Sequence, residues 1–220
     1  MRARAARATS PASTASNATR SARAILTDPG TRAAWRALLR STLAGGEYGG
    51  RGERAERGEF GGGRRAQARR VADLGAGTGS LSVLLAELGH RVTGLELSPA
   101  MAERAVTKAA DAGVEIDVVL GDAAEPSLPA GGFDVVLSRH VLWAMPDPAA
   151  ALDRWIALLA PRGQLVLVEG FWHTGGGLRA ETLLDLLRSR TATTRLVRLT
   201  DPVYWGGDPG DERYLIDARV

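Results

Sequence analysis

From Val71 onwards, short runs of Val and Leu alternate with segments of helical periodicity, and no other feature limits the possible folds as strongly. The runs are continuously apolar, which is typical of strands covered on both faces in a parallel sheet. Right-handed β-α-β connections between such strands give an open, doubly wound α/β sheet. The final two strands have no helix between them, so we expect the last to run antiparallel beside its predecessor. The expected strands are 71–75, 91–97, 114–120, 133–138, 164–170, 195–200 and 213–220, and the expected helices are 79–89, 99–112, 148–160 and 178–188.

The chain before this alternation has segments of different composition. Residues 1–26 are rich in Arg, Ala, Ser and Thr and contain no acid, which fits a leader such as a transit peptide, a disordered tail or a start codon placed too early. Residues 27–45 have an apolar stripe of helical period, and we expect an N-terminal helix that caps the substrate. Residues 46–66 alternate Gly, Arg and Glu and predict a linker loop, because they cannot bury enough surface to order themselves. We expect residues 67–220 to form the main domain.

The composition excludes several classes of protein. The 220 residues include no cysteine, so disulfide scaffolds, thiolate zinc sites and cysteine nucleophiles are excluded. No run approaches the roughly 18 apolar residues of a membrane helix, so we expect a cytoplasmic protein with no membrane partner. The formal charge of +3 conceals an uneven distribution, since residues 71–220 hold 13 basic residues and 20 acids, a net −7. This negative charge repels a phosphate backbone, so we expect no nucleic-acid partner.

A glycine-rich turn, DLGAGTG from Asp73 to Gly79, joins the first expected strand to its helix. Its glycines allow positive φ and let a ligand approach the bare backbone. A nicotinamide dinucleotide site has the pattern G-x-G-x-x-G, but Ser80 stands here in place of the third glycine. Asp73 would add negative charge beside a pyrophosphate, whereas it is compatible with a ligand that carries sulfonium and ammonium groups. The turn therefore favours S-adenosyl-L-methionine, and NAD is the alternative.

Acids also follow the next two expected strands. Glu96 ends the second strand and Asp122 follows the third. Ligands of such sheets bind outside the carboxyl ends of the strands, so these acids and Asp73 are expected at one edge. Glu96 can accept hydrogen bonds from both hydroxyls of a ribose, and Asp122 can accept one from an adenine amino group. The alternative interpretation is that all three acids are helix caps or turn residues.

Three stretches of the chain carry closely spaced motifs: VADLGAGTGSLSVLLAELGHRVTGLELSPAM, GDAAEPSLPAGGFDVVLSRHVLWAMPDP and LLAPRGQLVLVEG. Together they resemble the class I S-adenosylmethionine-dependent methyltransferases, in particular the small-molecule, ubiquinone-biosynthesis-like branch (methyltransferase type 11). The resemblance implies a Rossmann-like sheet of seven strands in the order 3-2-1-4-5-7-6, with the seventh antiparallel. The cofactor-binding residues that it implies are Asp73, Gly75, Gly77, Gly79, Glu96, Leu97, Met101, Asp122, Ala123, Ser138 and Arg139.

One feature of that family is absent from the sequence. Its members often have a Tyr-Asp segment near the N-terminus that closes over the cofactor, and residues 10–30 contain neither Tyr nor Trp. Either Trp35 and Tyr48 supply the lid, or the cofactor site is more open.

Two histidines are candidate general bases. His140 ends the fourth strand and can titrate near neutral pH, although it could instead make a structural hydrogen bond. His173 lies in FWHTGGG after the fifth strand, in an aromatic, glycine-hinged loop that suits a hydrophobic substrate wall, although it could be an ordinary exposed residue. Methyl transfer depends mainly on alignment, which can contribute about 7–11 kcal/mol. The three histidines have no metal-ligand spacing, so we expect no metal.

The sequence thus predicts a monomeric or homodimeric methyltransferase that moves a methyl group to oxygen or nitrogen of a small organic acceptor. The other hypotheses are a cofactor-binding protein that acts through a partner without catalysis, and an NAD-dependent oxidoreductase.

Overall fold

The computed structural model of the chain describes residues 28–44 and 67–220. The predicted leader, the predicted linker loop and Tyr48 lie outside these residues. Across the described ranges, no helix is both long enough and apolar enough to cross a membrane.

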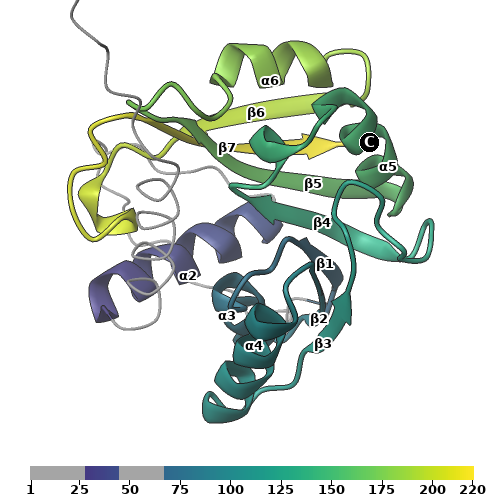
Figure 1. Cartoon of the computed structure of the whole chain (residues 1–220), viewed down its shortest axis with the longest axis vertical. Coiled ribbons are helices and arrows are strands. Elements are labelled where there is room, and N and C mark those ends of the chain that lie inside the picture. The colour runs from purple at the N-terminus through teal and green to yellow at the C-terminus, as the bar shows by residue number, and fades with distance from the viewer. Residues whose placement is uncertain (1–27, 45–66) are drawn as a thin grey trace, which may run out of the picture.

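A seven-stranded sheet forms the centre of the molecule, in the order β3-β2-β1-β4-β5-β7-β6 (Figure 1). β7 runs antiparallel to both β5 and β6, while the pairs among the first five strands are parallel. The predicted doubly wound α/β fold, its strand order and its antiparallel last strand are therefore confirmed. The strands are β1 (Arg70–Leu74), β2 (Arg91–Glu96), β3 (Asp117–Leu120), β4 (Phe133–Arg139), β5 (Leu159–Phe171), β6 (Thr193–Arg198) and β7 (Glu212–Arg219).

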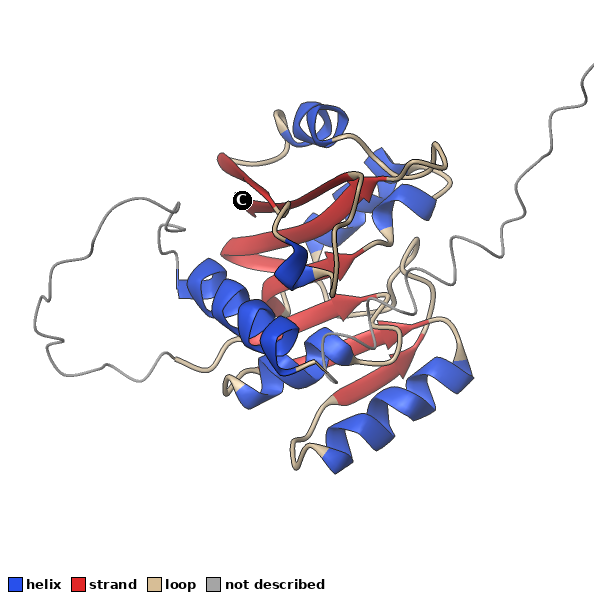
Figure 2. Cartoon of the chain, turned by 90° about the vertical axis from the view of Figure 1, so that its left-hand side faces the viewer, coloured by secondary structure: helices blue, strands red, loops and turns tan. Residues whose placement is uncertain are grey.

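Helices cover both faces of the sheet (Figure 2). One hydrophobic cluster joins the sheet to α2 and α3, and a second joins the opposite face to α5 and α6. The five inner strands β2, β1, β4, β5 and β7 thus bury apolar side chains on both of their faces, which explains their continuous Val and Leu runs, whereas the edge strands β3 and β6 have no fully buried residue. The helices are α2 (Pro29–Ala44), α3 (Ser80–Glu87), α4 (Pro99–Asp111), α5 (Pro148–Ala157) and α6 (Ala180–Leu187), with short 3-10 turns η1 (Leu142–Ala144) and η2 (Pro202–Tyr204).

The N-terminal helix α2 packs along the sheet by its apolar stripe. Asp28 caps it, because its Oδ2 accepts a hydrogen bond of 2.6 Å from the backbone N–H of Thr31. Trp35 is completely buried, and its indole N–H donates to the carbonyl oxygen of Tyr204 in η2. The helix therefore connects the sheet to the segment between β6 and β7.

The fifth strand begins earlier than predicted, at Leu159 rather than at residue 164. Leu159 pairs with Phe133, and the register then shifts before Val135 pairs with Gln164. The preceding helix correspondingly ends at Ala157 rather than at residue 160. A proline disfavours helical geometry at the residue before it, so Pro161 helps to end the helix early.

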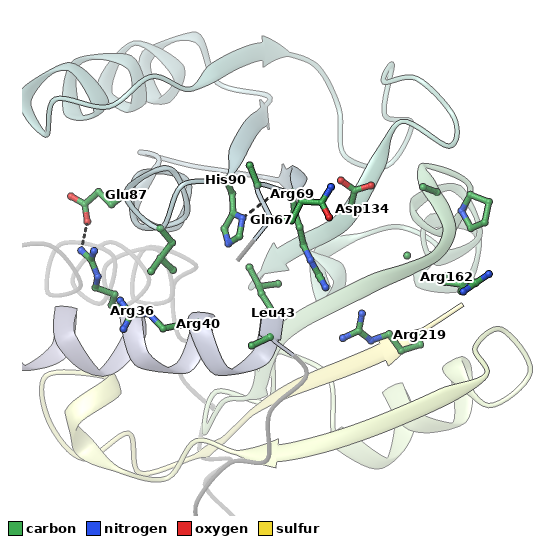
Figure 3. A pocket seen from close by; sticks show the side chains of 16 residues that line it. Arg36, Arg40, Leu43, Gln67, Arg69, Glu87, His90, Asp134, Arg162 and Arg219 are labelled. Carbon is green, nitrogen blue, oxygen red and sulfur yellow. Dashed lines mark hydrogen bonds and ion pairs between the residues drawn. The ribbon is translucent and has the colours of Figure 1, made fainter. Parts of the chain in front are cut away.

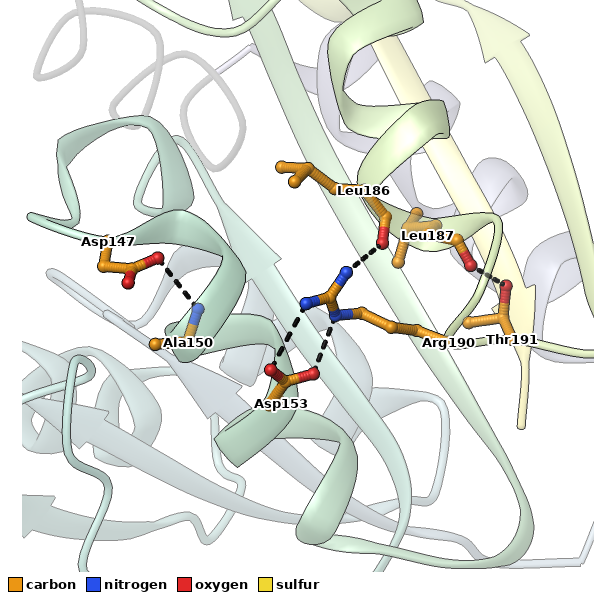
Figure 4. Close-up of polar contacts among 7 residues, drawn as sticks. All are labelled: Asp147, Ala150, Asp153, Leu186, Leu187, Arg190 and Thr191. Atoms are coloured by element: carbon orange, nitrogen blue, oxygen red, sulfur yellow. Dashed lines mark hydrogen bonds and ion pairs between the residues drawn. The ribbon is translucent and has the colours of Figure 1, made fainter.

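An ion pair and a helix cap stabilise α5 and α6, which cover the face of the sheet opposite α2 and α3 (Figure 4). Asp147 caps α5 by accepting a hydrogen bond of 3.0 Å from the backbone N–H of Ala150. Arg190, just after α6, makes contacts of 2.7 and 3.3 Å with the two carboxylate oxygens of Asp153 in α5. This bidentate pair ties the two helices together.

Candidate functional site

Three glycines shape the turn between β1 and α3. Gly75, Gly77 and Gly79 have φ angles of 69°, 59° and 71°, in the left-handed region. A Cβ on Gly75 would lie 2.4 Å from a methyl carbon of Val141, and one on Gly79 would lie 2.8 Å from the Cβ of Ala105. A Cβ on Gly77 would meet nothing within 4 Å. Gly75 and Gly79 therefore permit close packing, whereas Gly77 leaves open space above the backbone.

A cavity of about 700 Å³ lies beside this turn, at the carboxyl ends of β1 and β4. The turn, one face of α4 and the residues that follow β4 form its walls. The structure thus brings together predicted residues from three separate parts of the sequence. Those that line the cavity are Asp73, Gly75, Gly77, Met101, Arg139 and His140.

Asp73 supplies a buried acid at the bottom of the cavity. The hydroxyl of Ser82 donates a hydrogen bond of 2.6 Å to its Oδ2. Burial raises the pKa of Asp73 to about 6, although the Ser82 hydrogen bond and the positive charge of Arg139 act in the opposite direction. The group is therefore mainly ionised at neutral pH and places one negative charge beside the glycine turn.

Glu96 fixes the glycine turn to the end of β2. Its Oε2 accepts a hydrogen bond of 2.7 Å from the backbone N–H of Gly77, and its Oε1 accepts one of 2.9 Å from the N–H of Ser98. Glu96 does not itself line the cavity, and neither does the neighbouring Leu97, whose side chain is 68% exposed. Each carboxylate oxygen keeps a further lone pair with which it can accept another hydrogen bond.

The remaining predicted cofactor residues lie away from the cavity wall. Asp122 is exposed and accepts a hydrogen bond of 2.8 Å from the backbone N–H of Ala124, which is a turn contact. Ala123 is buried, and its carbonyl oxygen accepts from the indole of Trp155. Ser138 is completely buried and donates to the carbonyl oxygen of Leu74 at 3.0 Å. Their roles toward a cofactor stay predictions.

His140 lies among aromatic rings just after β4. Its ring stacks on Trp205 with centroids 5.8 Å apart and meets Trp172 edge-on at 5.4 Å. It has a φ of 58°, uncommon for a residue other than glycine. Burial and the charges of Arg139 and Arg213 hold the pKa of His140 well below its usual value. The imidazole is therefore neutral at pH 7, and its buried Nε2 has no hydrogen-bond partner among the residues that the structure describes.

Two arginines surround the same tryptophan. The guanidinium carbon of Arg139 lies 5.4 Å from the ring centre of Trp35 and 6.0 Å from that of Trp205. That of Arg213 lies 5.2 Å from Trp205 and 5.3 Å from Trp172. Such distances are within the range of cation–π attraction. We call Arg139, His140, Trp172, Trp205 and Arg213 the aromatic–arginine cluster.

The second predicted base, His173, is not part of the cavity wall. Its side chain is 67% exposed, and its Nδ1 lies 3.3 Å from Oδ2 of Asp211. Asp211 also pairs with Arg213 at 2.8 Å. The His173 side chain thus connects to Arg213 of the aromatic–arginine cluster through this carboxylate.

Sequence reasoning missed the polar face of α4. Lys108 donates a hydrogen bond of 2.6 Å to the hydroxyl of Thr78 in the glycine turn and one of 3.1 Å to that of Ser80, the first residue of α3. Burial lowers the pKa of Lys108 to about 8. The spacing of these residues could have revealed the face from the sequence, because residues three and four apart share one face of a helix. The residues of this face that line the cavity are Met101, Arg104, Thr107, Lys108 and Asp111.

Glu169, at the end of β5, was also missed. It is completely buried, and its Oε1 accepts hydrogen bonds from the backbone N–H groups of Val141 and Leu142 at 3.1 and 2.9 Å. Burial raises its pKa to about 8, so the carboxyl is mainly protonated at neutral pH. Glu169 thereby holds the loop that carries His140.

The strand order, the glycine turn after β1 and the acid at the end of that strand agree with the arrangement expected for a class I methyltransferase domain. Residues 72–167 match the family model described as "Methyltransferase domain".

Curated relatives match the same part of the chain. A ubiquinone biosynthesis O-methyltransferase of Xanthomonas axonopodis pv. citri is 35% identical over 99 residues, which are 44% of this chain and 41% of that protein. A nocamycin O-methyltransferase of Saccharothrix syringae is 35% identical over 101 residues, 44% of this chain and 36% of that protein. The similarity therefore spans less than half the length of these relatives.

Solved structures share the fold over a longer stretch. The N-methyltransferase NodS of Bradyrhizobium japonicum in complex with S-adenosyl-L-homocysteine has a TM-score of 0.63 at 22% identity, covering 89% of each chain. The [4+2]-cyclase SpnF has a TM-score of 0.58 at 22% identity, covering 69% of this chain and 75% of that one. Because one neighbour is a cyclase by name, likeness of fold alone does not define the reaction.

Proposed function

We propose that this chain is an S-adenosylmethionine-dependent methyltransferase that acts on oxygen or nitrogen of a small organic acceptor. The observation that carries the proposal is the cavity in which the Asp73 carboxylate lies beside the open backbone of Gly77. A buried negative charge favours a cationic ligand over a dinucleotide pyrophosphate. The matched relatives are O-methyltransferases by name, and the structural neighbour NodS is an N-methyltransferase.

The residues of the cavity fit such a cofactor. Asp73 offers a negative charge for an ammonium group, and the turn around Gly77 leaves the backbone accessible. Glu96 has lone pairs left for ribose hydroxyls, while Leu97 and Met101 offer apolar contacts for an adenine. Asp122 and Ala123 are assigned to the adenine edge. S-adenosylmethionine supplies an electrophilic methyl carbon on a sulfonium, so the protein's main task is to align the acceptor.

We assign the acceptor to the side of the cavity bordered by Arg139 and His140. Trp172 and Trp205 behind His140 hold the imidazole between two rings, which restricts its orientation. Glu169 holds the backbone of the following residues. Such rigid positioning reduces the entropy lost in reaching the transition state, which can contribute about 7–11 kcal/mol.

His140 acts, in this proposal, as a hydrogen-bond acceptor for the reacting hydroxyl or amine through Nε2. Because its pKa is low, the neutral imidazole is the resting form across the physiological range. His140 takes up a proton only when methyl transfer turns the acceptor's hydroxyl or amine into a strongly acidic, positively charged group. Alignment is therefore the main source of catalysis, and His140 is the secondary one.

Calorimetry tests the cofactor assignment directly. The full chain should bind S-adenosyl-L-homocysteine and should not bind NAD⁺ under the same conditions. Binding of NAD⁺ without binding of S-adenosyl-L-homocysteine would overturn the proposal in favour of an oxidoreductase.

A methyl-transfer screen with labelled S-adenosylmethionine tests the reaction. Small phenols, amines and carboxylic acids cover the acceptor atoms proposed, and product is detected as label in the acceptor. Cofactor binding with no transfer to any of these acceptors would favour the hypothesis of a non-catalytic cofactor-binding protein.

A further inference from the structure

A second cavity, of about 680 Å³, lies at the opposite edge of the sheet, where the parallel strands begin (Figure 3). Its walls come from the second half of α2, the residues before β1 and β2, and residues 160–163 of β5, where the register with β4 shifts. β7 runs antiparallel, so its last residue, Arg219, reaches this edge as well. The methyltransferase site is at the other ends of the strands, so the two cavities are separate.

The walls of this second cavity are strongly basic. Two acids line it, and both already have arginine partners: Glu87 pairs with Arg36 at 3.2 Å and also with Arg32, and Asp134 pairs with Arg70 at 3.0 Å. The other lining arginines have no ion pair within the described parts of the chain. These arginines are Arg40, Arg69, Arg162 and Arg219.

Arg69 and Arg219 point toward the same space (Figure 3). Nη1 of Arg69 donates a hydrogen bond of 2.7 Å to Oε1 of Gln164, and Gln164 in turn donates to the carbonyl oxygen of Thr42 and to Asp217. Burial and the positive charge of Arg219 lower the pKa of Arg69. The negative charges of Asp134 and Asp217 act in the opposite direction. Two like charges thus face one space, an arrangement that an anion between them would stabilise.

The backbone of Arg162 is a second indication that this cavity binds a ligand. It has a φ of 62°, in the left-handed region that glycine adopts without strain, and the next residue is Gly163. For other residues this conformation costs about 1–2 kcal/mol. Strained residues of this kind cluster at sites that bind ligands. Here the strained residue Arg162 in β5 places its exposed guanidinium at the rim of the basic cavity.

We propose that this second cavity binds a small molecule that carries at least two phosphate charges. Guanidinium groups match the geometry of phosphate oxygens and remain charged at all physiological pH values. Four lining arginines make no ion pair with any residue that the structure describes, so their combined charge exceeds what a ligand with one negative charge neutralises, and the volume exceeds that of a single ion. A long nucleic acid fits less well, because the arginines line a cavity of limited size and residues 71–220 have an excess of acids.

Binding of inorganic pyrophosphate to the full chain tests the proposal. Calorimetry and thermal unfolding at constant ionic strength should show one binding site per chain and a higher melting temperature. The same affinity is expected when saturating S-adenosyl-L-homocysteine is present, because the sites lie at opposite edges. Competition between the two ligands, or no binding of pyrophosphate, would overturn the proposal.

Variants locate the site. Arg219→Gln should lower pyrophosphate affinity about tenfold, the effect of one lost charge-assisted hydrogen bond. Arg162→Gly should lower the affinity while leaving the melting temperature unchanged or higher, since glycine relieves the strained φ. The control is Arg188→Gln, because Arg188 is 79% exposed on its side chain and pairs with Asp185 far from this cavity. Equal affinity in all three variants would refute the assignment.

A short DNA duplex distinguishes the two classes of anion. If the duplex bound more tightly than pyrophosphate and lost affinity in Arg219→Gln and Arg162→Gly, the surface would belong to a nucleic acid and the small-molecule proposal would be wrong. Weak, salt-sensitive duplex binding that all the variants share would support the proposal.

Discussion

The Oε2 of Glu96, at the end of β2, accepts a hydrogen bond of 2.7 Å from the backbone N–H of Gly77 in the glycine turn. This contact joins two predicted cofactor-binding residues that lie 19 positions apart in the sequence. It also orients the Glu96 carboxylate, so the lone pairs left over face a fixed direction. Glu96 thereby shapes the turn and can bind the cofactor at the same time.

Replacing Glu96 with Ala should weaken the binding of S-adenosyl-L-homocysteine by about 1.5–3 kcal/mol, the contribution of a hydrogen bond to a charged group. Calorimetry measures this change. Glu125→Ala is the matched control, because Glu125 has a side chain that is 78% exposed and pairs with Arg154. Unchanged affinity in Glu96→Ala would remove this residue from the cofactor site.

Alanine at two neighbouring glycines should have different effects. Gly75→Ala should unfold more easily by about 2–5 kcal/mol, because it has the cost of a left-handed φ and its Cβ would also overlap Val141. Gly77→Ala has open space for its Cβ, so its stability should fall only by the cost of the left-handed φ, about 1–2 kcal/mol. Its affinity for the cofactor should also fall. Gly89→Ala, with a φ of 90° and equally open space after α3, controls for the backbone strain. Full cofactor binding by Gly77→Ala would show that no ligand approaches that backbone.

The affinity for S-adenosylmethionine should fall as the pH is lowered through about 6. The pKa of Asp73 is about 6 in the folded protein, so below this pH its carboxyl takes up a proton and loses the charge that attracts a cation. Equilibrium binding across this range measures the effect. Asp73→Asn should bind weakly at every pH and should lack this dependence. A wild-type affinity that is constant through the window would contradict the role of Asp73.

His140→Ala should reduce turnover steeply and leave S-adenosyl-L-homocysteine affinity unchanged. At saturating S-adenosylmethionine, the wild-type kcat should show no step in the usual histidine range, because the pKa of His140 lies well below 6.5. Steady-state kinetics with an acceptor found in the screen provide the measurement. His173→Ala, examined in parallel, separates the two candidate bases. Loss of turnover in that variant alone would assign the base to His173.

Glu169→Gln should make the protein more stable at high pH relative to the wild type. The wild-type carboxyl has a pKa of about 8 when folded and about 4.5 when unfolded, so unfolding releases a proton between these values. Wild-type stability should therefore fall by up to about 1.4 kcal/mol per pH unit as the pH rises through this window. Urea denaturation at several pH values measures the difference. Glutamine keeps the oxygen that accepts from Val141 and Leu142, whereas Glu169→Ala should be less stable throughout. Parallel pH dependences for wild type and Glu169→Gln would contradict the burial of a protonated carboxyl.

The order of elements was predictable from sequence because the inner strands are buried on both faces and the helices on one. Continuous runs such as Val135 to Leu137 and the spaced leucines of α3 record that burial directly. The boundaries at Ala157 and Leu159 were not predictable, since they depend on the register shift between β4 and β5.

Within the candidate site, residues next to a turn or strand end could be read from the sequence, because local geometry requires them. The glycines have left-handed φ angles, and Asp73 follows from the rule that ligands bind at strand ends, whereas Arg139 came from the family resemblance. Lys108 was missed because a polar helix face normally faces solvent, and only its packing against the glycine turn gives it partners there.

The sequence by itself determined the fold class, the glycine turn and the acids at the strand ends, because each depends on local periodicity or backbone geometry. Only the tertiary structure decided that His140 is neutral between two tryptophans, since its pKa depends on burial and on Arg213, which is 73 positions away in the chain. The tertiary structure also placed Arg69, Arg162 and Arg219 around one cavity. Charges far apart in sequence become neighbours only when the antiparallel β7 brings the end of the chain back to the edge where β1 begins.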